Sequence, residues 1–463
     1  MNTRNYNWNY LLWISLISAM GGLLFGYDWV VIGGAKPFYE PYFQITGNSS
    51  LQGWVMSCAL IGCLAGAAFS GWLSDRFGRK RPLIIAACLF IVASIGTGSA
   101  NHLGSFIFFR ILGGIGIGLA SNLSPVYIAE VTPGSVRGRF VSLNQLTIVI
   151  GILVAQLVNW RIAEPVPPGS TVHQILFSWN GQMGWRWMFY ACSIPASLFF
   201  LLMWLVPESP RWLARNKGKE TKSRRILARI GGIKYADAEI MAIRETLTAG
   251  KTRADYRILR EPSVSKVLII GIVIAIFQQW CGINVIFNYA QEIFANAGYS
   301  VTDILFNIVI TGSVNLIFTF VGMFTVDRLG RKALMLIGAG GLACIYAIAG
   351  LMYFLNLHGL PLLAMVVIAI ACYAMSLAPV TWVVLSEIFP NRVRGIAMSV
   401  ATFALWGACF VLTYTFPLLN RMLHVSGTFW LYGLICVLGF WFILKKLPET
   451  KGKTLEQIEK EMK

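Results

Sequence analysis

The sequence predicts an all-α membrane protein: twelve transmembrane helices in two pseudo-symmetric six-helix bundles, with a cytoplasmic helical insert. Composition supports this fold class, because 56% of the 463 residues are apolar and only 13% are charged, whereas soluble domains have about 25% charged residues. Three charged motifs also occur twice in the same order, which indicates a duplicated unit. The pairs are DRFGRKRP and DRLGRKAL (75–82, 327–334), EVTPGSVRG and EIFPNRVRG (130–138, 387–395), and PESPRWL and PETKGKTL (207–213, 448–455).

The helices are predicted from apolar runs of roughly 20 residues, the length that crosses a bilayer core. The first begins at Leu11 and is too long for a cleavable signal sequence, so we expect it to remain as a helix. The first half contains runs near 11–33, 53–73, 82–101, 105–128, 140–160 and 186–206. The second half contains runs near 265–290, 304–326, 333–355, 361–386, 396–416 and 427–445.

Four regions follow from these runs: a bundle at 1–206, a linker at 207–264, a bundle at 265–447 and a tail at 448–463. The linker is the one sizeable polar stretch. Its segments have helical spacing with glycine stops, and they carry apolar residues that could be buried, such as Ile226 and Leu227. We therefore expect short amphipathic helices at 207–264 rather than a disordered connection.

The net charge of +18 reflects membrane topology rather than nucleic-acid binding. Lys and Arg concentrate after the second and fourth helices and in 207–264, whereas the opposite loops carry few, with Lys36 placed in the loop after the first helix. This positive-inside bias predicts that both termini and the linker are cytoplasmic. We expect an integral protein of the cytoplasmic (inner) membrane that contacts lipid, binds no nucleic acid and is monomeric.

The repeated D-R-x-G-R-K, the P-E-S-P-R and P-E-T-K-G segments and QQWCGINVIFNY at 278–289 resemble the sugar porter family of the major facilitator superfamily. The resemblance covers nearly the whole chain and is strongest to bacterial proton–xylose symporters. It implies two six-helix bundles around a central sugar site that opens alternately to each side of the membrane. A monosaccharide, pentose or hexose, and protons would be the transported species.

Two ionisable residues stand out inside the apolar runs, Asp28 and Arg110, and such residues are functional candidates because they are costly in a membrane. Each lies about five residues from the outer end of its run, or roughly 8 Å deep, so they can pair. Pairing favours an ionised carboxylate, and an apolar site without the partner favours the protonated one. The resemblance also assigns such a pair to proton coupling. The alternative is a permanent structural ion pair.

A polar group in the seventh run predicts the sugar site. Gln278, Gln279 and Asn284 need hydrogen-bond partners in apolar surroundings, and amides both donate to and accept from sugar hydroxyls. In an unbroken helix Gln279 and Asn284 would point about 140° apart, so they converge only if Gly282 interrupts the helix. The alternative is hydrogen bonding between helices.

Further sugar contacts are implied by the resemblance alone: Gln145, Asn315 and Trp382, with Phe25 and Trp406 as aromatic walls. The chain departs from the family pattern at two places near this site. Asn288 precedes Tyr289 where the family commonly has two tyrosines, and Leu405 precedes Trp406 where it often has an amide. These departures leave the identity of the sugar open.

The repeated cytoplasmic motifs are predicted to form an inner gate, because topology alone requires only positive charge and these motifs carry both signs in both halves. The alternative is that they only fix topology. The first-half gate residues are Asp75, Arg79, Glu130, Arg137, Glu208 and Arg211. Their second-half counterparts are Asp327, Arg331, Glu387, Arg394 and Glu449.

Other functions are disfavoured by the sequence. It contains no G-x-x-x-x-G-K-[ST] motif for ATP binding, and it shows no metal-ligand spacing or nucleophile constellation of an enzyme, so no cofactor or metal is expected. The glycine run at 113–118 lies inside an apolar helix and favours close packing. A facilitative sugar uniporter is the nearest alternative and would not need Asp28. A membrane sugar sensor ranks lower, because only about 15 residues follow Pro448.

Overall fold

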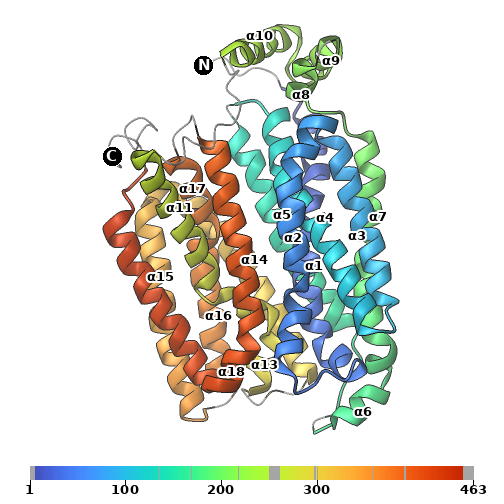
Figure 1. Ribbon diagram of the computed structural model, residues 1–463, viewed down its shortest axis with the longest axis vertical. Coiled ribbons are helices and arrows are strands. Elements are labelled where there is room, and N and C mark those ends of the chain that lie inside the picture. Colours follow the sequence, from blue (N-terminus) through green and yellow to red (C-terminus); the bar gives the residue numbers. More distant parts are fainter. Residues whose placement is uncertain are drawn as a thin grey trace. The chain divides into compact units, whose positions relative to one another are not determined.

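The computed structural model describes residues 6–134, 136–167, 169–216, 218–249, 261–296, 299, 301–357, 359–389 and 393–451. Its described elements are helices (Figure 1). Those of the first half are α1 (Trp8–Tyr42), α2 (Ser49–Phe77), α3 (Lys80–Gly98), α4 (Leu103–Val131), α5 (Arg137–Ile162), α6 (Val172–Phe177), the π-helix η1 (Asn180–Gly184) and α7 (Trp185–Leu205). The linker contains α8 (Pro210–Arg215), α9 (Glu220–Gly231) and α10 (Ile233–Ala249).

The second half interrupts its helices more often. It contains α11 (Pro262–Trp280), α12 (Ile283–Asn288), α13 (Ala290–Asn296), α14 (Val301–Leu329), α15 (Arg331–Phe354), α16 (Leu360–Met375), α17 (Leu377–Ile388) and α18 (Arg394–Lys446). Each break has a local cause. Gly282 adopts a φ of 86° between α11 and α12, a conformation that glycine accepts without steric cost. His424, with φ 58° and ψ 173°, interrupts the backbone inside α18.

Eleven candidate membrane spans lie within the described residues, and one of them, Ile396–Lys446, contains the break at His424. Because its 51 residues are twice the length of the others, it corresponds to two spans. The predicted twelve transmembrane helices are therefore confirmed, with bounds within a few residues for most of them. The first is the exception, because α1 continues through Pro37 and Pro41 to Tyr42 rather than ending near residue 33.

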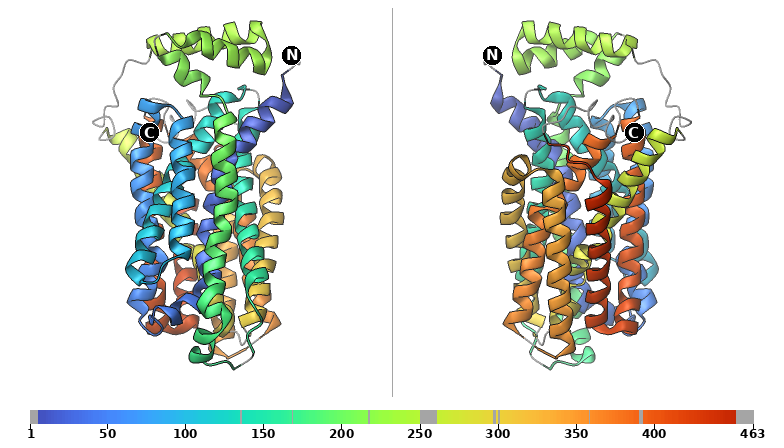
Figure 2. Two further views of the ribbon diagram at one scale, coloured as in Figure 1. Left: turned by 90° about the vertical axis from the view of Figure 1, so that its right-hand side faces the viewer. Right: turned by 90° about the vertical axis from the view of Figure 1, so that its left-hand side faces the viewer.

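The linker folds into the short helices that its spacing predicts, up to Ala249. Ser209 caps α8 by accepting a hydrogen bond from the Trp212 N–H at 3.3 Å, and Pro210 follows at the first helical position. Leu227 and Ile230 are buried, so the linker has a packed face. In both views of Figure 2, α9 and α10 lie beside each other next to α8. Residues 250–260 and 452–463 lie outside the described residues.

Contacts divide the chain into two compact units that differ from the two predicted bundles. The first unit contains residues 1–28, 61–151 and 189–254, and the second contains 29–60, 152–188 and 255–463. The boundary between the units cuts α1, α2, α5 and α7. One end of each of these helices therefore groups with the second half of the chain. The four-region division remains a prediction from sequence symmetry.

Candidate functional site

Asp28 and Arg110 form a buried ion pair inside the first unit. The Arg110 Nη1 donates to Asp28 Oδ1 at 2.7 Å, and the two residues are 6% and 3% exposed. The guanidinium also lies 5.8 Å from the ring centroid of Phe189. The other carboxylate oxygen, Oδ2, is buried and accepts no hydrogen bond from the described residues. The two ionisable residues that stand out in the apolar runs are therefore paired with each other, and one carboxylate oxygen is left without a donor among the described residues.

The predicted interruption in the seventh span is present at Gly282. Helix α11 ends at Trp280, and α12 begins at Ile283. A β-carbon at Gly282 would lie 2.8 Å from the Tyr432 ring, so both the backbone angle and the packing require glycine here. The interruption lets residues on either side of it face one another, as the sugar-site hypothesis requires.

The three predicted amides are hydrogen-bonded in a chain. Asn284 Nδ2 donates to Gln279 Oε1, and Gln279 Nε2 donates to Gln278 Oε1. Gln278 Nε2 then donates to the hydroxyl of Tyr373 on α16 at 2.8 Å. Gln278 and Gln279 are 5% and 6% exposed. The structure thus brings the amides together, and it adds Tyr373, which sequence reasoning missed because an aromatic residue in an apolar run carries no distinguishing signal.

The remaining predicted sugar contacts lie in both units, so each is described within its own unit. In the first unit Phe25 on α1 and Gln145 on α5 are half-buried. In the second, Asn288, Asn315 and Trp406 are buried and Trp382 is 36% exposed. The rings of Trp29 and Trp406 lie 6.1 Å apart, and Asn284 Nδ2 lies 3.9 Å from Cys409 Sγ.

The first D-R-x-G-R-K motif takes part in a compact charge cluster within the first unit. Arg79 Nη2 donates to Glu130 Oε1 at 2.7 Å, and the Arg79 backbone N–H donates to Glu208 Oε1 at 2.8 Å. Ser209 donates its hydroxyl to Glu130 Oε2. Gly78, with φ 89°, makes the turn that presents these N–H groups. The cluster therefore ties the ends of α2, α4 and α7 together.

The second motif builds an equivalent cluster within the second unit. Arg331 Nη2 donates to Glu387 Oε1 at 3.0 Å, its backbone N–H donates to Glu449 Oε1 at 3.0 Å, and Thr450 donates to Glu387 Oε2 at 2.6 Å. Gly330 has φ 90°. Burial alone would raise the pKa of Glu449, but hydrogen bonds from backbone N–H groups, including those of Lys451 and Arg331, outweigh it and lower that pKa below its ordinary value.

Other predicted gate residues surround the first cluster. Asp75 lies 3.9 Å from Arg79 and 3.7 Å from Arg215, while Arg137 is half-buried at the start of α5. The side chains of Asp327 and Arg394 lie outside the described residues. The contacts described for both clusters join residues of the same half of the chain.

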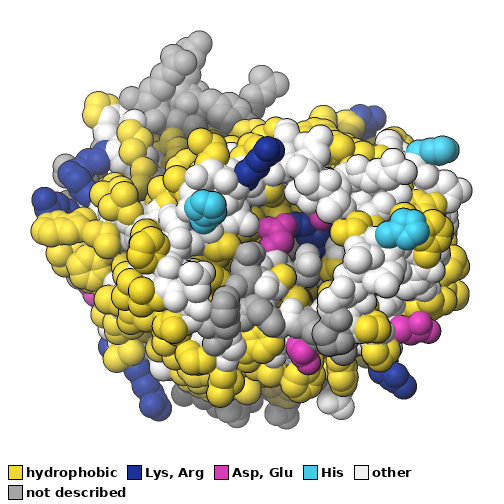
Figure 3. Space-filling model, turned by 90° about the horizontal axis from the view of Figure 1, so that it is seen from below, with side chains coloured by type: hydrophobic (Ala, Val, Ile, Leu, Met, Phe, Trp, Pro, Cys, Tyr) yellow, Lys and Arg dark blue, Asp and Glu magenta, His cyan; other side chains and the backbone are white. Residues whose placement is uncertain are grey.

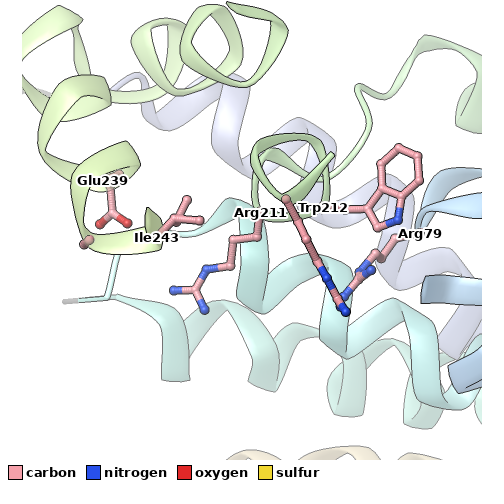
Figure 4. A pocket seen from close by; sticks show the side chains of 7 residues that line it. Arg79, Arg211, Trp212, Glu239 and Ile243 are labelled. Atoms are coloured by element: carbon pink, nitrogen blue, oxygen red, sulfur yellow. The ribbon is translucent and has the colours of Figure 1, made fainter. Parts of the chain in front are cut away.

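A pocket of about 240 Å3 adjoins the first cluster, on its linker side (Figure 4). In Figure 4 Arg79 and Trp212 lie on one side of it, Glu239 and Ile243 on the other, and Arg211 between them. Arg215 and Ala242 complete the lining. Two of the predicted gate residues, Arg79 and Arg211, therefore line this pocket. Within the described part of the chain, no group of three or more His, Cys, Asp or Glu residues is placed to hold a metal ion.

Sequence reasoning placed Lys36 in a loop, and this prediction was wrong. Lys36 lies within α1, and it is fully buried. Its Nζ contacts the carboxylate of Glu292 on α13, and it lies 3.6 Å from Glu40 Oε1. The positive-inside count could not reveal this, because it treats every lysine near a span end as solvated.

Twelve membrane spans with a buried ion pair and a broken helix carrying amides define a membrane transporter rather than an enzyme. The model of the family described as "Sugar (and other) transporter" matches residues 14–462, and the chain belongs to this family. The chain is 39% identical to the D-xylose-proton symporter of Escherichia coli (strain K12), over 99% of this chain and 97% of that protein. It is 36% identical to the arabinose-proton symporter of Bacillus subtilis (strain 168), over 99% and 96%.

The fold is that of a solved relative. A structure of the xylose transporter XylE from E. coli, described as a partially occluded inward-open conformation, superposes with a TM-score of 0.85 at 38% identity. The match covers 96% of this chain and 100% of that one. The predicted major facilitator fold is therefore confirmed.

Proposed function

We propose that this protein imports a monosaccharide, a pentose or hexose, by proton symport through alternating access. The observation that carries the proposal is the buried ion pair of Asp28 and Arg110 at 2.7 Å in a chain of the sugar transporter family. A uniporter has no need for a titratable carboxylate in an apolar site, where a charge is costly. The similar D-xylose and arabinose proton symporters support both the substrate class and the coupling ion.

In this mechanism Asp28 carries the proton. While Arg110 donates to Oδ1, the carboxylate remains ionised. When the pair separates, the apolar surroundings favour the neutral acid, so Asp28 takes a proton from the side to which the site is open. Reforming the pair expels that proton. The unsatisfied Oδ2 is the acceptor atom through which the proton would be gained.

The sugar would bind at the amides of the broken seventh span. Gln278, Gln279 and Asn284 already exchange hydrogen bonds with one another and with Tyr373. A sugar hydroxyl can replace a link in this chain without leaving an amide unpaired, because each amide both donates and accepts. Phe25, Gln145, Asn288, Asn315, Trp382 and Trp406 are proposed as further contacts.

The inner clusters are proposed to form the cytoplasmic gate, and the concentration of Lys and Arg at that end supports cytoplasmic termini in the inner membrane. We further propose that the protein acts as a monomer. The identity of the sugar is testable by counterflow in proteoliposomes, in which one labelled monosaccharide exchanges against a panel of unlabelled pentoses and hexoses. Competition by a subset of the panel would support the proposal, whereas the absence of exchange with every sugar would contradict it.

A further inference from the structure

A buried lysine lies between two carboxylates near the C-terminal end of α1. Lys36 has no exposed surface. Its Nζ contacts the Glu292 carboxylate, lies 3.6 Å from Glu40 Oε1, and sits 4.5 Å from the centroid of the Tyr289 ring. Burying an ammonium group is costly unless it is paired and hydrogen-bonded, so these contacts determine where Lys36 can reside. Charged side chains are sparse on the face of the structure that is seen from below in Figure 3.

The second carboxylate is held on the same helix as the lysine. Glu40 is 8% exposed, and Gln52 on α2 donates to its Oε2 at 2.9 Å. Its Oε1 accepts no hydrogen bond from the described residues. Glu40 stands four residues after Lys36, the spacing at which side chains on a helix reach each other. The lysine therefore has one partner on its own helix and one on another.

The other partner lies on a helix that has its own breaks. Glu292 belongs to α13, a segment of seven residues. Tyr289, with φ −119° and ψ 23°, separates α13 from α12, and Gly282 separates α12 from α11. Helix α1 packs closely against the end of α12, because a β-carbon at Gly33 would lie 2.9 Å from the backbone oxygen of Asn288. Two breaks therefore precede this seven-residue helix, and the Lys36–Glu292 ion pair joins it to α1.

We propose that Lys36 is a positioning residue for transport: it locks α13 to α1 through Glu292 and exchanges to Glu40 when α13 moves away. This inference rests on the proposed transport function and orientation, which place the pair at the outer end of the protein. The exchange explains why one lysine has two carboxylates. When Glu292 departs, Glu40 still compensates the ammonium charge, so the open state contains no unpaired buried lysine. Water that enters on opening weakens the Lys36–Glu292 attraction further.

The direct test is a reversible cross-link between the two positions that the lock joins. Lys36→Cys and Glu292→Cys are introduced into a background without the nine native cysteines and treated from outside with a short bifunctional methanethiosulfonate reagent. We expect the reagent to react, because the lock opens during the cycle. Sugar counterflow should then fall at least about tenfold and recover after reduction. Failure to react, or counterflow that continues across the cross-link, would show a static pair and overturn the proposal.

A matched cross-link between Tyr42→Cys and Arg186→Cys is the control. The Arg186 Nη2 donates to the Tyr42 hydroxyl at 2.8 Å, so this contact also fixes the end of α1, but both residues belong to the first half of the chain. The control cross-link should leave counterflow unchanged. If the protein without cross-linker exchanges no sugar, the proposed transport function fails. If the cross-linked protein continues to exchange sugar, the transport function stands and only the lock is overturned.

A second measurement does not depend on transport. Glu292→Gln should speed amide hydrogen exchange in residues 283–296 by about tenfold, which corresponds to about 1.4 kcal/mol, because the neutral amide holds Lys36 less tightly. Glu40→Gln should change this segment much less, since Glu40 is the reserve partner. Arg186→Gln is the control for general loosening of α1. Equal exchange in all three variants would overturn the lock.

Discussion

The charge clusters of this protein differ in whether they are repeated in the two halves of the chain. The clusters at the two D-R-x-G-R-K motifs have matching contacts: Arg79 with Glu130 and Arg331 with Glu387. The Lys80 and Lys332 ammonium groups match as well, donating to backbone oxygens at 2.7 and 2.9 Å. Among the described residues, the cluster around Lys36 and the pair of Asp28 with Arg110 each occur once. The repeated clusters belong to the duplicated sequence motifs, whereas the unique charges lie outside those motifs.

This difference separates two uses of buried charge. A repeated cluster joins helix ends within its own half and is reinforced by backbone N–H groups, as at Glu208 and Glu449. The Asp28–Arg110 pair and the Lys36 cluster instead leave an oxygen of Asp28 and one of Glu40 without a hydrogen bond from the described residues. Incomplete satisfaction is costly in a static structure, and it is what a group that exchanges partners or protons requires.

Asp28→Asn is the strongest test of the unique pairs. Asparagine preserves shape and hydrogen bonding but cannot titrate, so gradient-driven accumulation of sugar should be abolished while sugar exchange persists. Uptake into proteoliposomes is measured with and without a pH gradient. Accumulation that remains at the parent level in the mutant would assign coupling to another group.

The amide chain is expected to show the next largest effect. Gln279→Ala should weaken sugar binding by about 1–3 kcal/mol, or roughly 5- to 150-fold, because a sugar hydroxyl loses its buried partner. Binding to the purified variant is measured by calorimetry, with Tyr373→Phe as a matched change at the end of the chain. Unchanged affinity combined with a lower unfolding temperature would identify the amides as contacts between helices.

The equivalence of the two inner clusters is tested by a matched pair of variants. Arg79→Met and Arg331→Met each strand a half-buried glutamate, and each should lower the free energy of unfolding by about 3 kcal/mol. Thermal unfolding in detergent compares them. A large loss of unfolding free energy in one variant alone would mean that the two clusters contribute unequally to stability, despite their matching contacts.

The gate hypothesis predicts a smaller shift of population. Glu387→Gln weakens the Arg331 contact and should increase the cytoplasmic accessibility of an engineered cysteine by a few-fold, since about 1 kcal/mol corresponds to roughly fivefold. Labelling rates with a membrane-impermeant thiol reagent provide the measurement. Normal expression without faster labelling would favour a role in topology and folding only.

The smallest effect concerns pH. The pKa of Glu449 is lowered in the folded protein, so the stability it contributes is present above its ordinary pKa of about 4.5 and is lost as the pH falls through the lower folded value. Glu449→Gln should therefore reduce the stability difference between pH 7 and acidic pH. Thermal unfolding across this range compares parent and variant, and parallel curves would contradict the assignment.

Most of the fold was predictable because bilayer thickness sets helix length and charge sets topology. The Asp28–Arg110 pair was also predictable, because charged residues stand out within apolar runs. The break at Gly282 was predictable because the amides on either side of it converge only if the helix is interrupted there. The cluster around Lys36 was not. The helix continues through Pro37 and Pro41, residues that usually end one, and the partner Glu292 lies on a helix of the other half. The hydrogen bonds among the amides and with Tyr373 depend on side-chain rotamers. Residue spacing in the sequence does not determine these rotamers.

The central claim is that this transporter couples sugar movement to protons, and sugar-dependent pH change in proteoliposomes tests it most directly. A pH-sensitive dye is enclosed in vesicles containing the parent protein, and a sugar identified by counterflow is added outside. We predict that the interior acidifies with sugar entry and that a protonophore abolishes the change. Counterflow of the same sugar without any change in interior pH would contradict symport and identify a uniporter.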